Sequence, residues 1–349
     1  MKFIELSLDQ RRQLIDIQQR HDAWRFADRA FRASNKGSMA WKKVSGKQYL
    51  YRIDGRVQKG LGPRTAETEA LKEAYMSRRT LERARVTKMH KAINDNARIN
   101  RAMGLARVPQ IAADVIREFD RSGLLGDGLF IVGTHALYAY EARSGITFEP
   151  ELLATRDLDL LADVRARLVL AIDGKKRDGI LQTLRNVDKS FNVQGDLFRA
   201  VNADGYFVDV IRPMRKNEGS LGEYDLGGVV PAGIDGLNWL INSARFEATA
   251  IAEDGKPVWM SCIDPRAFAL HKLWVSKQTA REAIKRRRDA TQAAAVAEVA
   301  QLLGLKFDKK ELAALPKELL DGTVELLKPI GENIRPPTPE KRATKRKKT

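Results

Sequence analysis

The chain has 349 residues, of which 62 are Lys or Arg and 45 are Asp or Glu, so its formal net charge is +17. This length allows a sizeable buried core and two or three domains. The single cysteine, Cys262, excludes an internal disulfide, and the four histidines are scattered without the spacing of a zinc site.

A cytoplasmic location and no membrane partner are expected. No apolar run approaches the roughly 18 residues that a transmembrane helix needs, and the first residues lack the long apolar segment of a signal peptide. The excess of positive charge favours a polyanionic partner such as RNA or DNA. A basic protein whose charge only keeps it in solution is the alternative.

Residues 1–105 are predicted to form a separate module of helices and strands. Apolar residues recur at helical spacing over Leu6–Phe31, and β-rich runs follow around a hairpin signal at Asp54-Gly55. Thr65 then caps a long charged helix. The discontinuous apolar stripe of this helix would pack either on the core of the protein or on a second copy in a homodimer.

The β-rich runs between these two helices combine basic and aromatic side chains. They predict strands over residues 39–44, 49–53 and 56–60. Lys42, Lys43 and Arg52, with the aromatic rings beside them, could grip a nucleic-acid backbone. A β-meander that shields its own core with lysines explains the same composition, so both interpretations stay open.

A strand-to-helix turn in the middle of the chain is a candidate anion site. Leu129–Val132 is a short apolar run that predicts a buried strand, and His135–Ala142 has the composition of a helix. Gly133 and Thr134 form the turn between them, where free backbone N–H groups and the helix dipole favour phosphate. Many α/β units have such a turn, so this feature alone is not specific.

Three carboxylates lie on two further predicted strands. Asp157 and Asp159 alternate with leucines, so both point to the same side of a sheet, and Arg156 beside them could orient or neutralise the pair. Asp209 is the one charge in an apolar run, where burial without a partner would be costly. A solvated strand edge explains the first pair but not Asp209. The set predicts two divalent metal ions that hold a nucleoside triphosphate for in-line attack.

These motifs, Gly-Thr-x-Ala-Leu, Thr-Arg-Asp-Leu-Asp-Leu and Val-Asp-Val-Ile, resemble the DNA polymerase β-type nucleotidyltransferase superfamily. The resemblance covers about residues 39–304. It implies a mixed central sheet flanked by helices, with Mg²⁺ (or Mn²⁺) held by Asp157, Asp159 and Asp209 near the Gly133 turn. Two departures are a threonine where serine or glycine is commoner and a longer gap between the turn and the first acid.

A narrower resemblance rests on Asp264–Leu273 and on the basic stretch that follows. These segments are similar to a bacterial group of nucleotidyltransferase-fold proteins, itself distantly similar to the nucleotidyltransferase toxins of abortive-infection systems. The resemblance implies that Lys272 faces the nucleotide phosphates. Arg281, Lys285 and Arg288 are predicted to share one face of the next helix, where they would contact triphosphate or acceptor RNA, or would be solvated.

The chain is therefore predicted to be an α+β protein with four parts. A helical and β-hairpin module is expected over residues 1–105, and a polymerase β-like nucleotidyltransferase core over 106–225. A C-terminal hairpin and helical region would span 226–335, and a disordered basic tail 336–349.

The predicted activity is metal-dependent transfer of a nucleoside monophosphate from an NTP to an acceptor hydroxyl. The acceptor could be RNA such as tRNA, a protein or a small molecule, and the basic charge favours RNA. The alternative is a nucleic-acid-binding protein with a catalytically degenerate core. A toxin controlled by a cognate antitoxin would be a biological role of the same chemistry.

Overall fold

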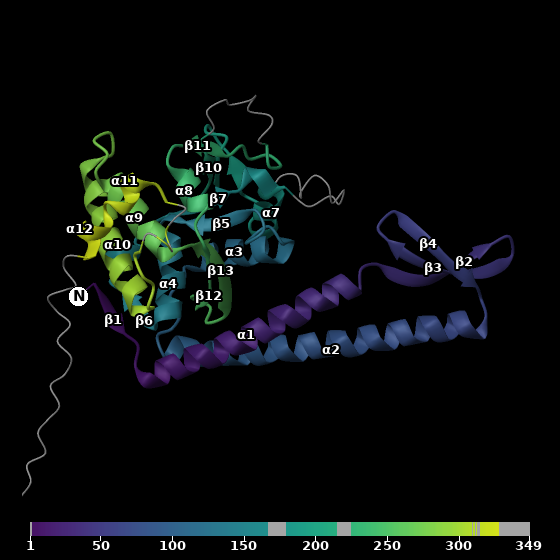
Figure 1. Ribbon diagram of the computed structural model, residues 1–349. Coiled ribbons are helices and arrows are strands. Elements are labelled where there is room, and N and C mark those ends of the chain that lie inside the picture. Colours follow the sequence, from purple (N-terminus) through teal and green to yellow (C-terminus); the bar gives the residue numbers. More distant parts are fainter. Residues whose placement is uncertain are drawn as a thin grey trace, which may run out of the picture. The chain divides into compact units, whose positions relative to one another are not determined.

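The computed structural model describes residues 2–166, 179–214, 225–308, 310, 312 and 315–327 (Figure 1). The chain divides into two units. The first, which we call the core unit, comprises Met1–Glu5, Asp114–Ala248 and Met260–Thr349, and the second, the N-terminal unit, comprises Leu6–Ala113 and Thr249–Trp259. The tail predicted over residues 336–349 lies outside the described residues.

Two long helices form the frame of the N-terminal unit, α1 (Leu8–Ser34) and α2 (Ala66–Ala102). Each helix begins with a capping box, in which the side chain of the residue before the helix accepts a hydrogen bond from a backbone N–H of the first turn. The acceptors are Ser7 for α1 and Thr65 for α2. Both predicted helices are confirmed, and each extends slightly beyond its expected end.

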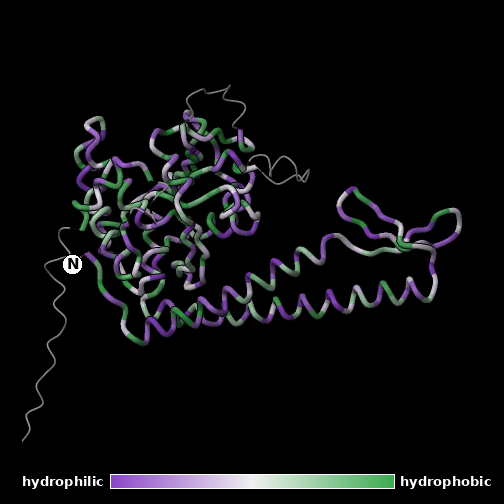
Figure 2. Tube along the Cα trace, in the orientation of Figure 1, coloured by the Kyte–Doolittle hydropathy of each residue, from purple (hydrophilic) through white to green (hydrophobic). Residues whose placement is uncertain are grey.

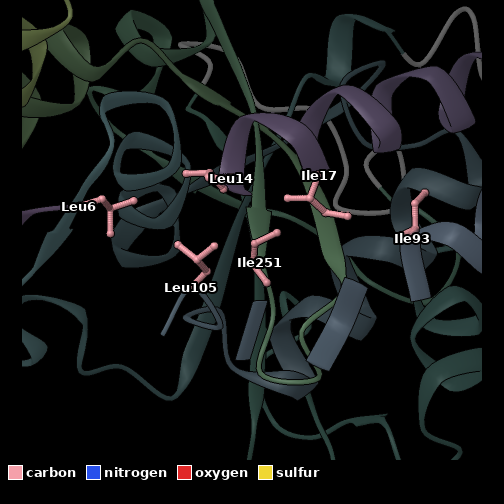
Figure 3. Packing of buried hydrophobic residues seen from close by; sticks show 6 residues of the cluster. All are labelled: Leu6, Leu14, Ile17, Ile93, Leu105 and Ile251. Carbon is pink, nitrogen blue, oxygen red and sulfur yellow. The ribbon is translucent and has the colours of Figure 1, made fainter. Parts of the chain in front are cut away.

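A cluster of buried apolar side chains joins the first half of α1 to the last third of α2 (Figure 3). Along the rest of both helices hydrophilic and hydrophobic residues are interleaved (Figure 2), so this cluster is the main apolar seam between them. Its members are Leu6, Leu14, Ile17, Ile93, Leu105 and Ile251.

A three-stranded antiparallel meander connects α1 to α2. Its strands are β2 (Ser38–Val44), β3 (Lys47–Asp54) and β4 (Val57–Pro63), which confirms the strands predicted there. The Tyr75 hydroxyl of α2 donates a hydrogen bond to the Gly37 carbonyl at 3.2 Å. The meander is therefore fixed to the first half of α2.

An eight-stranded sheet forms the centre of the core unit. Its strands are β5 (Leu129–Val132), β7 (Asp157–Ala162), β8 (Asn192–Val193), β9 (Arg199–Val201), β10 (Phe207–Pro213), β11 (Ala232–Ile234), β12 (Arg245–Ile251) and β13 (Pro257–Ile263). Their order is β12-β13-β5-β7-β10-β9-β8, and β11 pairs with β10. β7 is antiparallel to β5 and parallel to β10. The predicted α+β class with a mixed sheet is confirmed.

Helices surround this sheet in the core unit (Figure 1). A separate antiparallel pair is formed by β1 (Phe3–Glu5) and β6 (Ile146–Phe148). The longest of these helices is α10, which packs against α9, as Figure 1 shows. Residues 249–259, at the tip of the β12–β13 hairpin, are counted with the N-terminal unit. The helices are α3 (Gln110–Ser122), α4 (Ala136–Ser144), α5 (Pro150–Leu153), α7 (Ile180–Val187), α8 (Leu237–Ile241), α9 (Pro265–Ser276), α10 (Ala283–Leu302), α11 (Lys317–Leu320) and α12 (Thr323–Leu327).

One detail of the predicted C-terminal region is wrong. Arg281 was expected on the same helix as Lys285 and Arg288, but α10 begins at Ala283, with Glu282 as its N-cap. Arg281 therefore lies in the connection before the helix, where helical spacing does not determine its direction.

Among the described residues, no helix combines the length and the apolar character that crossing a membrane requires.

The buried cluster of the N-terminal unit predicts a stability difference between two isoleucines of α1. Ile17 is fully buried, whereas Ile15 is 52% exposed. Ile17→Ala should lower the free energy of unfolding by about 2–5 kcal/mol through lost apolar burial and a residual cavity. Ile15→Ala should change it by less than about 0.5 kcal/mol. Urea unfolding followed by circular dichroism measures both, and equal losses would show that the cluster does not carry this stability.

Candidate functional site

Three carboxylates lie side by side on the two central parallel strands of the core unit. In β7, Leu158 and Leu160 are fully buried, so the alternating Asp157 and Asp159 point away from the core. The register of β10 on β7 places Asp209 directly beside Asp159. One oxygen from each of the three carboxylates can be chosen so that all lie within 4.8 Å of one another. Residues 50 positions apart in sequence thus form one acidic cluster.

The carboxyl group of Asp159 has a strongly raised pKa. Burial first, and then repulsion from Asp157 and Asp209, raise the pKa of its carboxyl from 3.8 to about 7. The positive charges of Lys272 and Arg199 lower the pKa but do not cancel these effects. The cluster therefore has a deficit of positive charge. Three carboxylates with such a deficit form an oxygen-only donor set that could hold a divalent metal ion.

Two of the acids are oriented by neighbouring side chains. The Thr155 hydroxyl donates a hydrogen bond to Asp157 Oδ1. Arg199 of β9 binds Asp209 through two parallel bonds, from Nε to Oδ1 at 2.7 Å and from Nη2 to Oδ2 at 2.6 Å. A bidentate pair fixes the plane of a carboxylate and still leaves two of its lone-pair directions for other ligands.

Arg199 is a site residue that the sequence reasoning missed. Its guanidinium lies 5.0 Å from the ring centre of Phe207 and 5.5 Å from that of Phe198, which restricts its position further. Antiparallel pairing of β9 and β10 places it opposite Asp209. The available signal was an opposite charge ten residues upstream across a turn at Gly205, but Arg199–Val201 is too short to be predicted as a strand.

The turn after β5 is packed against the acidic cluster. Gly133 has φ +63°, a left-handed conformation, and a Cβ at this position would collide with Asp159 Oδ2. Glycine in such a turn lets a phosphate approach the backbone closely. The structure adds a second reason, which is that only glycine leaves room for the Asp159 carboxylate.

Thr134 of the same turn is bound to α10. Its buried hydroxyl oxygen accepts hydrogen bonds from Arg288 Nη2 at 2.8 Å and from Gln292 Nε2 at 3.2 Å. Gln292 also donates to the Leu152 carbonyl at 2.8 Å. Both acceptor positions of the hydroxyl are used, so it has only its proton left to offer to a ligand. Gln292 thus holds the turn in place, a role that its sequence position did not reveal.

A buried carboxylate anchors two of the predicted phosphate-binding cations. Asp289 is 2% exposed and accepts a hydrogen bond from Lys272 Nζ at 2.7 Å and another from Arg281 Nε. Lys272 is close enough to the acidic cluster to lower the pKa of Asp159. The structure therefore places a fixed positive charge beside the acids, with its counter-ion on α10.

No hydrogen bond or ion pair with the three acids is seen for the remaining predicted residues within the described part of the chain. Lys285 is exposed on α10 and pairs with Glu282 at 2.9 Å, whereas Arg281 lies before the helix and does not join Lys285 and Arg288 on one helical face as predicted. Arg156 is exposed at the start of β7. Lys42, Lys43 and Arg52 belong to the meander of the N-terminal unit.

Comparison with known proteins adds a family match. A family model described as nucleotidyltransferase matches residues 110–315, more than half of the chain. The matched range contains the three carboxylates, the Gly133 turn, α9 and α10. No curated protein and no solved structure matches the chain.

The raised pKa of Asp159 predicts how pH changes the stability of the metal-free protein. Between pH 4 and 7 the folded state binds more protons than the unfolded state, so stability falls as pH rises through this window. Asp159→Asn removes the free-energy cost of ionising this carboxyl in the folded state. Its gain in unfolding free energy should be roughly 1–3 kcal/mol larger at pH 8 than at pH 5, since each unit of pKa corresponds to about 1.4 kcal/mol.

Urea unfolding in the presence of a chelator measures this difference, and Asp163→Asn is the matched control. Burial favours a higher pKa for Asp163, but its hydrogen bonds and ion pair with Arg165 lower that pKa below its ordinary value. Asp163 is therefore ionised at both pH values, and its replacement should have the same effect at each. A gain for Asp159→Asn that does not depend on pH would contradict the raised pKa.

Proposed function

The chain belongs to the nucleotidyltransferase family, and on that premise we propose that it transfers a nucleoside monophosphate from an NTP to an acceptor hydroxyl. The observation that carries the proposal is the cluster of Asp157, Asp159 and Asp209 beside the Gly133 turn. These three residues would hold Mg²⁺ or Mn²⁺, because hard divalent cations prefer carboxylate oxygens. Bound there, such ions supply Lewis-acid stabilisation of phosphoryl oxygens.

Residues of the chain would bind the triphosphate, compensate its charge and help to remove the proton of the attacking hydroxyl. The Gly133 turn leads directly into α4, and the backbone N–H groups and the helix dipole at this start of the helix favour binding of the triphosphate. Lys272, fixed by Asp289, would offset negative charge on the phosphates. Asp209 would help to remove the proton of the attacking hydroxyl, with its carboxylate plane set by Arg199.

The acceptor that we propose is RNA, which the net charge of +17 supports. A protein hydroxyl or a small molecule could serve as acceptor in the same reaction. A toxin with a cognate antitoxin would be a biological role of that reaction. A nucleic-acid-binding protein with an inactive core is the rival function. The three acids with their orienting partners favour an active site over this rival.

Single substitutions of the acids test the activity. Asp157→Asn, Asp159→Asn and Asp209→Asn should each reduce metal-dependent transfer at least a hundredfold and leave the fold intact, since each removes one charge from a crowded cluster. The assay incubates the full chain with each α-labelled NTP, Mg²⁺ or Mn²⁺, and total RNA or total protein, and then follows the label. If the parent protein labels no acceptor under any of these conditions, the inactive-core alternative is favoured.

Arg199 provides a test of the orientation of Asp209. Arg199→Ala should lower turnover about tenfold or more, since hydrogen bonds to charged groups contribute about 1.5–3 kcal/mol. It should also bind Mn²⁺ more tightly, because removing a positive charge leaves the acids less neutralised. Titration with Mn²⁺ followed by electron paramagnetic resonance measures this binding without turnover.

Arg165→Ala is the control for Arg199, because Arg165 also pairs with a carboxylate but lies 55% exposed beside Asp163. It should change neither turnover nor Mn²⁺ affinity. Arg199→Ala with parental turnover would exclude an orienting role for this arginine.

A further inference from the structure

The meander of the N-terminal unit carries a dense positive charge. Residues 36–64 contain eight basic side chains and one acidic side chain, Asp54. Such a density on a small sheet favours binding to a polyanion and disfavours pairing of the sheet with a copy of itself. The basic residues are Lys36, Lys42, Lys43, Lys47, Arg52, Arg56, Lys59 and Arg64.

One face of the meander is partly covered within its own unit. Leu50 on this face is fully buried, and Trp41 lies opposite it on β2. Arg64 and Lys72 lie over the Trp41 ring, at 5.3 Å and 5.7 Å from its centre. We call this the inner face, because α2 contributes Lys72 to it.

The other face, which we call the outer face, carries two tyrosines. Strand alternation places Tyr49 and Tyr51 opposite in direction to Leu50, and cross-strand pairing joins Lys42 to Tyr49. Residues beside them on this face are exposed, and they are Val44, Lys47, Gln58 and Gly60. The outer face therefore carries two lysines, Lys42 and Lys47, beside two half-buried tyrosine rings.

Small neighbours leave room around the Tyr51 ring. Ala40 pairs with Tyr51 on one side and Gly60 on the other. A Cβ at Gly60 would lie 3.7 Å from the ring, so the ring extends over the glycine backbone. Lys42 Nζ lies 5.8 Å from the ring centre and donates to Gln58 Oε1 at 2.6 Å. A flat group placed on the ring would have a positive charge within reach.

The three basic residues predicted to contact nucleic acid do not share a face. Lys42 is on the outer face, whereas Lys43 and Arg52 alternate to the inner side, where both are exposed. Arg52 also reaches back toward the Lys36 carbonyl, at 3.5 Å. The adjacent lysines Lys42 and Lys43 thus lie on opposite faces of one sheet.

We propose that the outer face binds single-stranded RNA, with bases stacked on Tyr49 and Tyr51 and with phosphates neutralised by Lys42 and Lys47. Stacking on the accessible part of these rings requires unpaired bases, which a duplex hides and which RNA presents in loops and ends. Binding itself does not depend on catalysis. That the bound RNA is the acceptor rests on the proposed function.

The aromatic part is tested with the full chain and a fluorescein-labelled 12-nucleotide RNA, by fluorescence anisotropy. The double variant Tyr49→Ile, Tyr51→Ile replaces the rings by β-branched side chains, which also suit a strand, and it should bind the RNA about tenfold more weakly or worse. Tyr49→Phe, Tyr51→Phe keeps the rings and should bind like the parent. Unchanged affinity of the isoleucine variant, or equal losses in both double variants, would overturn stacking.

The electrostatic part uses the two adjacent lysines as a matched pair. Lys42→Gln should reduce the slope of log affinity against log salt by about 0.7, the value for one phosphate contact on a single strand. Lys43→Gln makes the same change of charge and should leave the slope as it is. Equal effects of the two variants would show unspecific attraction and would overturn the assignment to the outer face.

Three further outcomes would also overturn the proposal. They are binding of duplex RNA as tight as that of the single strand, tighter binding of DNA of the same sequence, and a parent dimer that dissociates in the isoleucine variant when followed by sedimentation. Asp159→Asn separates this inference from the proposed function, because it should abolish transfer and retain RNA binding. RNA binding by a parent protein without transferase activity would refute only the proposed function.

Discussion

Three carboxylates can share one face of a sheet only if positive charge or protonation offsets their repulsion. In the core unit, parallel pairing of β7 and β10 brings Asp159 next to Asp209, with Asp157 one step along the same face. Arg199 and Lys272 supply part of the compensating charge, but burial and the repulsion from Asp157 still raise the pKa of Asp159. The remaining deficit is what a divalent cation would fill.

Hydrogen bonds from side chains of α10 hold parts of this site in position. Two of its buried polar residues, Asp289 and Gln292, are three positions apart and therefore on neighbouring parts of one face. Asp289 anchors Lys272, and Gln292 anchors Thr134. One helix thus fixes both the cation beside the acids and the turn that precedes α4. A buried carboxylate with two cationic partners also avoids the cost of an unpaired charge.

The N-terminal unit has a different physical design. Its two capped helices are joined by one apolar cluster, and its meander combines net positive charge with aromatic rings. An acidic cluster that could hold a metal ion in one unit and basic side chains in the other would suit the proposed binding of a nucleotide and of RNA by separate parts of the chain.

The sequence by itself determined the features that depend on local periodicity and local chemistry. Acid–leucine alternation in β7, the single acid in the apolar β10, the capping residue Thr65 and the glycine turn all act within a few residues. Only the tertiary structure decided which distant groups meet. Arg199 reaches Asp209 through strand pairing, Asp289 reaches Lys272 through helix packing, and Gln292 reaches Thr134 across 158 positions. Registers and packing angles are set by the whole fold, so no local pattern in the chain could specify these contacts.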